Sequence, residues 1–197
     1  MKFKNKLFLL LAVSAVTAAC ESSKEKKEER QEIHEHETAP VKDRSGSLSP
    51  HTEAMAIVDG AHVHIDYSAP SVRDRIIFGG LVAFDRVWQA GAHNATWIET
   101  DKDLEIGESI LPAGKYGFFL IPRKQDEWSV IFNSRWEQHG KDDYNEAEDV
   151  LRFNVTPQES KEPQEVLKYE VNKTGEKTGD IVFSWEKKKI IIPFRVK

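Results

Sequence analysis

Apolar and polar residues alternate along most of the chain beyond residue 49, and this pattern is typical of β-strands. Residues 61–68 show it most clearly, because their apolar side chains fall on one predicted face and His62, His64 and Asp66 on the other. Further strands are predicted at 96–100, 104–106, 116–122, 128–133, 150–156, 164–171, 180–185 and 189–196. Short strands separated by turn residues predict an all-β fold, an antiparallel β-sandwich or jelly-roll-like single domain.

Two charged stretches interrupt the strand pattern. Residues 142–149 replace β-branched residues with charged and helix-favouring ones, which predicts at most one short helix. The lysines at 187–189 stand between two apolar segments, which favours a charged hairpin turn. Residues 49–197 contain no further break in composition, so we expect one core, supplied by the chain's 5 tryptophans and 10 phenylalanines.

The first nineteen residues have the pattern of a secretory signal peptide. Three lysines within the first six residues precede the apolar run 7–16, and the small residues T-A-A stand at 17–19. Cys20, the sole cysteine, follows directly, so no intramolecular disulfide can form. The sequence T-A-A-C resembles the lipobox of bacterial lipoproteins, which implies acylation of Cys20 and attachment to a lipid bilayer. The alternative is a plain secretory signal followed by an incidental cysteine.

Residues 20–48 are polar and charged and show no periodicity, which predicts a disordered charged tether. Together with the lipobox they predict a location in the cell envelope, at the outer membrane. The acidic and lysine-rich run after Cys20 resembles signals that carry some lipoproteins to the cell surface, and a solubilising spacer on the periplasmic face is the alternative. The net charge of −5 argues against a nucleic-acid partner, which would require a basic face.

The segment 67–96 concentrates polar and aromatic side chains between two predicted strands, and we expect a ligand site there. Arg73 and Arg75 are two positions apart, so in an extended segment they would form a fork for a carboxylate, sulfate or phosphate. Alternatively, each arginine pairs with an acidic residue such as Asp85 or Asp149. The candidate ligand-binding residues are Ser68, Arg73, Arg75, Trp88, His93 and Asn94.

A metal site is the alternative interpretation of the histidines. His62 and His64 share a strand face about 7 Å apart, and His93 could supply a third ligand. Such a site would support a metal-assisted hydrolase or a cupin-like oxygenase. Exposed histidines on the solvent face of an edge hairpin explain the first two with fewer assumptions. We assign no catalytic residue and expect no cofactor, with a divalent metal as the alternative.

Several motifs together resemble a known family. They are Y-S-A-P-S at 67–71, R-D-R-I-I-F-G at 73–79, V-W-Q-A-G-A-H-N-A-T at 87–96 and P-A-G-K-Y at 112–116. On these residues the folded part resembles the exported Bacteroidetes family known as domain of unknown function 2911, and departs from its pattern at Asp74, Gln89 and His93. The resemblance implies no particular chemistry. We therefore expect a lipid-anchored envelope protein that is a binding module for a small polar or anionic ligand or another envelope component.

Overall fold

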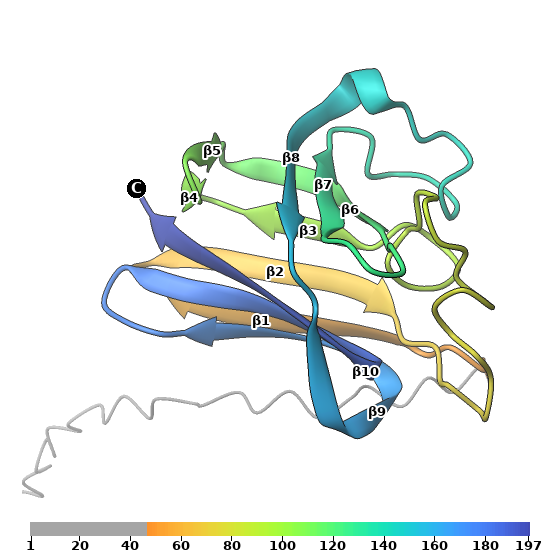
Figure 1. Ribbon diagram of the computed structural model, residues 1–197. Helices are drawn as coiled ribbons and strands as arrows, with labels where there is room; N and C mark the ends of the chain where they lie inside the picture. The colour runs from red at the N-terminus through yellow and green to blue at the C-terminus, as the bar shows by residue number, and fades with distance from the viewer. Residues whose placement is uncertain (1–46) are drawn as a thin grey trace, which may run out of the picture. The chain divides into compact units, whose positions relative to one another are not determined.

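The computed structural model describes residues 47–197, which form two antiparallel β-sheets (Figure 1). The first has the order β1-β2-β3-β6-β7-β8, with β1 His51–Val58, β2 Ala61–Ser68, β3 Trp97–Thr100, β6 Gly114–Ile121, β7 Trp128–Asn133 and β8 Asp149–Val155. The second has the order β5-β4-β10-β9, with β4 Leu104–Ile106, β5 Ser109–Leu111, β9 Gln158–Lys173 and β10 Thr178–Val196. The predicted all-β sandwich is confirmed.

The helix that forms is shorter than the segment 142–149 in which it was predicted. Within residues 47–197 one turn of 3-10 helix forms, at Glu146–Glu148, and the Asn145 side chain caps it by accepting a hydrogen bond from the Ala147 N–H. None of the helical structure in this described part is long and apolar enough to cross a membrane. The predicted signal peptide at 1–19, the acylation site Cys20 and the tether up to residue 46 lie outside the described residues.

Strand β1 has no counterpart in the predicted strands. It pairs with β2 along its full length, and the two are joined by a tight turn at Asp59 and Gly60, with φ of 48° and 71°. The alternation in β1 is weak, because its inward positions include the small residues Ala54 and Ala56. The Asp-Gly pair before the predicted strand at 61–68 is a strong hairpin signal, and it could have identified β1.

Strand β10 corrects the prediction of two strands joined by a lysine turn at 187–189. It runs from Thr178 to Val196 without a turn, and register shifts around Glu186, with φ of 52°, form a bulge. Lys188 lies opposite Glu159 of β9 and forms an ion pair with it. The predicted hairpin is wrong because β9 is long enough to supply an acidic partner across the strand.

The core lies between the sheets and is rich in aromatic rings. The alternating face of β2 is confirmed, since Val63, Ile65 and Tyr67 are buried. The largest fully buried side chains include Trp128, Trp185, Tyr169, Phe118, Phe132 and Phe183. Each such side chain stabilises the fold by about 1.5–3 kcal/mol relative to its exposed state.

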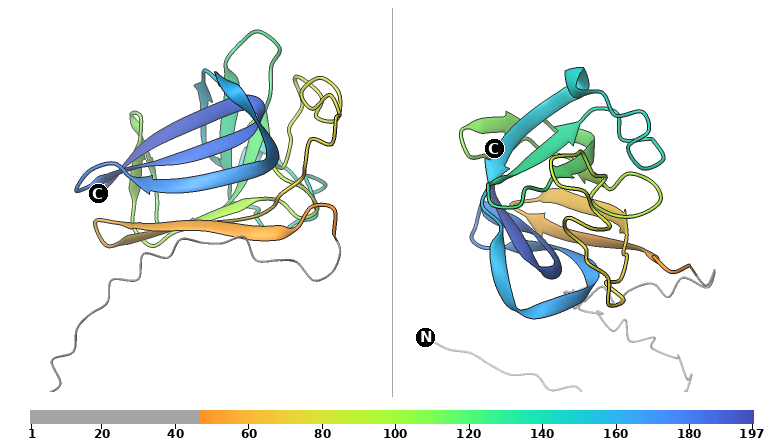
Figure 2. Two further views of the ribbon diagram at one scale, coloured as in Figure 1. Left: turned by 90° about the horizontal axis from the view of Figure 1, so that it is seen from below. Right: turned by 45° about the vertical axis from the view of Figure 1, so that its right-hand side comes forward.

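A second apolar cluster fixes the loops that form the site. Phe119 of β6 and Ile131 of β7 face away from the main core and pack with Ala95, Val87 and Tyr144. The last three belong to the connections between β2 and β3 and between β7 and β8. Both connections therefore cover the outer face of the first sheet, and Figure 2 shows them at one end of the molecule's two sheets.

The loop between β7 and β8 is also held by a buried amide. Asn133 is fully buried, donates to Asn145 O (2.9 Å) and Asp149 Oδ1 (2.8 Å), and accepts from the Arg135 N–H (2.9 Å). We predict that Asn133→Ala lowers the free energy of unfolding by about 2 kcal/mol, because it leaves buried partners unpaired. Urea unfolding measures this change.

Asn172→Ala is the matched control for this prediction. Asn172 is exposed, and within residues 47–197 its side-chain amide bonds only Asp180, at 2.9 Å, so the expected change is below about 0.5 kcal/mol. Equal effects of the two substitutions would contradict the anchoring role of Asn133.

Candidate functional site

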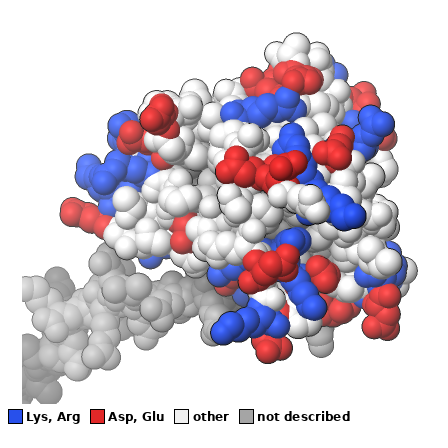
Figure 3. Space-filling model, viewed as in Figure 1, with Lys and Arg blue, Asp and Glu red and all other residues white. Residues whose placement is uncertain are grey.

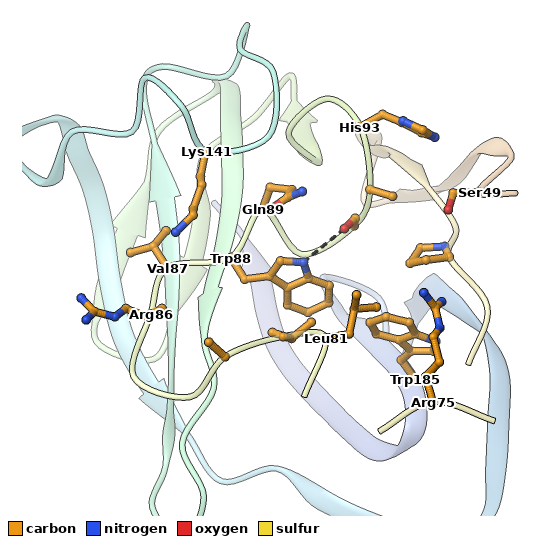
Figure 4. A pocket seen from close by; sticks show the side chains of 15 residues that line it. Ser49, Arg75, Leu81, Arg86, Val87, Trp88, Gln89, His93, Lys141 and Trp185 are labelled. Carbon is orange, nitrogen blue, oxygen red and sulfur yellow. Dashed lines mark hydrogen bonds between the residues drawn. The ribbon is translucent and has the colours of Figure 1, made fainter. Parts of the chain in front are cut away.

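A cavity of about 470 Å³ opens between the loops that follow β2 and β7 (Figure 4). Its lining comes from the connection between β2 and β3, from Lys141 in the β7–β8 loop, from Trp185 of β10 and from Ser49. The volume lies in the range of small-molecule sites. Residues distant in sequence therefore meet at one concave surface.

One wall of the cavity is a compact turn at residues 76–82. Gly79 N–H donates to Val82 O (2.8 Å) and Leu81 N–H to Ile76 O (3.0 Å). Gly79 has φ of 88°, a conformation that favours glycine. Val82 is buried, whereas Ile76 and Leu81 are exposed, and Leu81 lines the cavity. The turn thus presents an apolar edge to any ligand.

A second wall is the segment that begins at Trp88. Trp88 exchanges two backbone hydrogen bonds with Leu120 of β6, at 2.8 and 2.9 Å, and its indole Nε1 donates to Gly91 O (3.2 Å; Figure 4). Its ring stacks on Trp185 with centroids 5.6 Å apart and 23° between the planes. These contacts fix the indole of Trp88 against the core.

The carbonyl of Ala90 attaches this segment to both sheets. It is buried and accepts from Thr96 Oγ1 (3.1 Å) and from Tyr169 Oη of β9 (2.8 Å). Burial raises the pKa of Tyr169 well above its ordinary value, so its hydroxyl keeps the proton that it donates. Ala90 and His93 have φ of 52° and 59°, which these bonds help to maintain.

The polar lining of the cavity is cationic. Arg75, Arg86 and Lys141 line it, and none of its lining residues is an aspartate or a glutamate. Figure 4 places Arg86 and Lys141 on one side of Trp88 and Arg75 on the other. On the face of the molecule in Figure 3, by contrast, basic and acidic side chains are interspersed. The cavity is thus a local concentration of positive charge.

Two of these cations are not neutralised by any group within residues 47–197. The side chains of Arg86 and Lys141 form no hydrogen bond or ion pair with any other part of residues 47–197. Arg75 donates through Nε to Val72 O (3.1 Å) and through Nη2 to Ser71 O (2.6 Å), so in the described part of the chain its charge also lacks an acidic partner. The positive potential of all three is available to a ligand.

The predicted arginine fork is wrong. Arg73 and Asp74 have φ of 51° and 56°, so the chain turns at these residues and is not extended. Arg73 donates to Leu48 O and does not line the cavity. The predicted acidic pairing is wrong as well, because Asp85 lies 3.8 Å from Arg123 and Asp149 interacts with Arg152 and Tyr144.

The other predicted ligand residues divide between two cavities. Trp88 and His93 line the cationic cavity together with Arg75. Ser68 and Asn94 line a second one of about 400 Å³, with Trp97, Trp136 and the His51–Asp66 pair (2.8 Å). The division falls between His93 and Asn94, and the backbone at Asn94 pairs with His139, which also lines the second cavity.

The three histidines of the metal hypothesis are not brought together. His64 Nε2 lies 2.9 Å from Glu53 Oε2, and its ring meets the edge of Trp97 at 5.0 Å. His62 is exposed on the same strand as His64. His93 lies in the loop that lines the cavity, and its Nε2 is 3.4 Å from Ser47 Oγ. Across residues 47–197 no group of three or more His, Cys, Asp or Glu is arranged to hold a metal ion.

The lining residues that were not among the sequence candidates include Arg86, Gln89, Lys141 and Trp185. Arg86 and Gln89 fall within the segment 67–96 and could have been included on that ground. Lys141 and Trp185 carried no signal, because the first lies in an acidic loop and the second in an apolar strand, and only packing brings them to the cavity.

The comparisons with known proteins give a family without a function. A family model described as "Protein of unknown function (DUF2911)" matches residues 49–194. No curated protein and no solved structure matches the chain. The function must therefore be inferred from the geometry of the site itself.

We predict that Tyr169→Phe lowers the free energy of unfolding by about 1 kcal/mol, because the Ala90 carbonyl loses one of its two buried donors. Amide exchange at Ala92, whose N–H donates to Ser68 O (3.3 Å), should accelerate as the loop loosens. Tyr116→Phe is the control, since its hydroxyl bonds only Pro112 O, at 2.9 Å and outside this loop. Unchanged exchange at Ala92 in Tyr169→Phe would refute the anchoring role.

Proposed function

We propose that this chain, which belongs to the family described as "Protein of unknown function (DUF2911)", binds a small organic anion in the cavity beside Trp88. One observation carries the proposal. Arg75, Arg86 and Lys141 line the cavity without a single carboxylate among the lining residues. A concave surface with charge of one sign attracts ligands of the opposite sign, and bonds between charged partners are the strong ones.

The apolar lining supports an organic ligand over a small inorganic ion. Trp88 and Trp185 contribute aromatic surface, and Leu81, Val82 and Val87 contribute aliphatic surface. Sites of this volume usually combine such walls with a few polar groups that orient the ligand. Gln89 and His93 supply uncharged hydrogen-bonding groups in the same lining. The ligand we propose therefore has an anionic end and an apolar body.

The walls are held in place without a ligand, which favours binding. The turn at 76–82, the Ala90 carbonyl and the Trp88–Trp185 stack are all fixed by internal contacts. A site that is already ordered loses little conformational entropy when it is occupied. Only the long side chains of Arg86 and Lys141 must be ordered on binding, since both are exposed.

We further propose that acylated Cys20 holds this binding domain at a lipid bilayer of the cell envelope. The support is the lipobox-like T-A-A-C at 17–20 after an apolar leader. A polar connection of residues 21–48 would leave the cavity accessible to soluble ligands.

The binding proposal predicts a charge dependence. Isothermal titration of the wild type with benzoate, inorganic phosphate and glucuronate should detect at least one ligand, with affinity falling as salt is added. Arg86→Ala and Lys141→Ala should each weaken the affinity for that ligand about fivefold, the equivalent of roughly 1 kcal/mol for one exposed charged contact. Neither substitution should lower the free energy of unfolding, because neither side chain has a partner within residues 47–197.

Lys173→Ala is the matched control for these variants. Lys173 is also an exposed cation, at the end of β9, and it lines neither cavity. Its removal changes the net charge equally and should leave affinity unchanged. Equal losses in all three variants, or no binding of any anion by the wild type, would refute the proposal.

The anchoring proposal predicts that Cys20→Ser moves the protein from the membrane to the soluble fraction or leaves it unprocessed. Fractionation of cells and mass measurement of the mature N-terminus give the result. Membrane association equal to the wild type would show that the acyl chains are not the anchor.

A further inference from the structure

The second cavity, of about 400 Å³, has a wall of two tryptophans on the outer face of the first sheet. Trp97 of β3 and Trp136 of the β7–β8 loop both line it, and both are half-buried. Trp97 lies opposite Gly117 in the β3–β6 register. A Cβ atom at Gly117 would lie 3.1 Å from Arg135 O and 3.3 Å from Trp136 Cα, so the glycine lets the loop cross the sheet closely. This close crossing brings Trp136 beside Trp97, with ring centroids 6.1 Å apart.

Lys115 of β6 fixes the two rings relative to each other. Its Nζ lies 3.3 Å from the centroid of the Trp97 ring and 3.9 Å from that of Trp136, so the ammonium is held between the two indoles. Glu99 is the cross-strand neighbour of Lys115, yet within residues 47–197 the two form no ion pair. Lys115 does not itself line the cavity. The aromatic wall is thus ordered from outside the cavity before any ligand binds.

The polar groups of the second cavity differ from those of the cationic one. Its lining contains two carboxylates, Asp66 and Glu137, and no lysine or arginine. Asp66 uses Oδ2 to pair with His51, at 2.8 Å. The side chains of Ser68, Asn94 and Glu137 form no hydrogen bond or ion pair with any other part of residues 47–197. Both donors and acceptors are therefore available to a ligand.

These charges decide which class of ligand suits the second cavity. The two carboxylates repel an anion, so the class proposed for the first cavity is disfavoured here. An organic cation is disfavoured on the rings, because Lys115 already places a positive charge between them and like charges at short distance repel. The lining favours a neutral ligand with apolar C–H faces for the indoles and several hydroxyl groups for the polar side chains.

We propose that the second cavity binds a neutral saccharide, at a site separate from that of the proposed organic anion. A pyranose ring has apolar C–H faces that pack on aromatic rings, and its hydroxyls both donate and accept. The apolar face contacts Trp97 and Trp136, while the Asn94 amide and the Asp66 carboxylate bond hydroxyls at the edge of the sugar ring. Because sugars differ mainly in the directions of their hydroxyls, these polar groups select among them.

Titration calorimetry with glucose, galactose, mannose and N-acetylglucosamine tests the proposal. At least one of these sugars should bind the wild type. Sorbitol should bind about tenfold more weakly than the preferred sugar, because it has the hydroxyls without a rigid apolar face. The 2-amino counterpart of the preferred sugar carries a positive charge and should bind no more tightly than that sugar.

Two substitutions locate the binding. Trp136→Ala should weaken the affinity for the preferred sugar about tenfold, and Asn94→Ala about three- to tenfold, the scale of one aromatic contact and one hydrogen bond. Phe84→Ala and Gln125→Ala are the matched controls, since they remove a half-buried aromatic ring and an exposed amide that do not line this cavity. Both controls should leave the affinity unchanged.

The indole resonances of the wild type give a second measurement, which also serves if Trp136→Ala does not fold. The indole Hε1 resonances of Trp97 and Trp136 should shift on addition of the preferred sugar. Those of Trp128 and Trp185 should not, because both side chains are fully buried and line no part of this cavity.

The outcomes separate this inference from the proposed function. If none of the four sugars binds, if sorbitol binds as tightly, or if Trp136→Ala and Phe84→Ala have equal effects, the saccharide site is refuted. Tighter binding of the amino sugar would refute the neutral class. Arg86→Ala, which acts at the first cavity, should leave the affinity for the sugar unchanged. Anion binding therefore stands or fails independently of this site.

Discussion

The buried carbonyl oxygen of Ala90 is the point on which the arrangement of the cavity depends. A buried backbone carbonyl must be paired, and this one accepts from Thr96 at the entry to β3 and from Tyr169 of β9. Tyr169 belongs to the second sheet and Thr96 directly precedes a strand of the first, so the loop is tied to both. Tyr169 is itself positioned by Tyr67, whose hydroxyl accepts from the Tyr169 N–H at 3.2 Å. The positions of Trp88 and His93 on either side of Ala90 follow from this attachment.

The aromatic wall of the cavity is continuous with the core of the sandwich. Phe78 contacts Trp88, Trp128 and Trp185, with ring centroids 6.2, 4.6 and 6.0 Å away. Because interiors are close-packed, the wall has little freedom to move without disturbing the core. The cations at the cavity are different, since Arg86 and Lys141 are exposed and unrestrained by partners among residues 47–197. The site thus joins a rigid apolar surface to adaptable charges.

Several local rules of stability are broken in this one place. Three cations lie at one cavity without carboxylates, Ala90 and His93 in its loop adopt positive φ, and the buried Trp185 indole has no partner among residues 47–197. In other described parts of the chain opposite charges pair across strands, as at Lys188 and Glu159, and positive φ at Asp59 and Glu186 belongs to a turn and a bulge. Departures from local consistency are expected at functional sites, because function and stability place different demands on the same residues. Their concentration here is the structural reason for placing the function in this cavity.

The sequence by itself determined the fold class, because alternation with a period of two is a property of neighbouring residues and needs no tertiary information. It also indicated the loop at 67–96, since proline, glycine and arginine at close spacing mark an irregular segment. It missed β1, where alanines weaken the alternation, and it divided β10 at its lysines, whose acidic partner lies on another strand.

The site itself was decided by the tertiary structure. Lys141 and Trp185 reach the cavity through packing of distant segments, and the backbone turn at Arg73 and Asp74 separates two arginines that an extended chain would have aligned. Contacts between residues far apart in the chain depend on how the sheets and loops pack, and no local pattern encodes that.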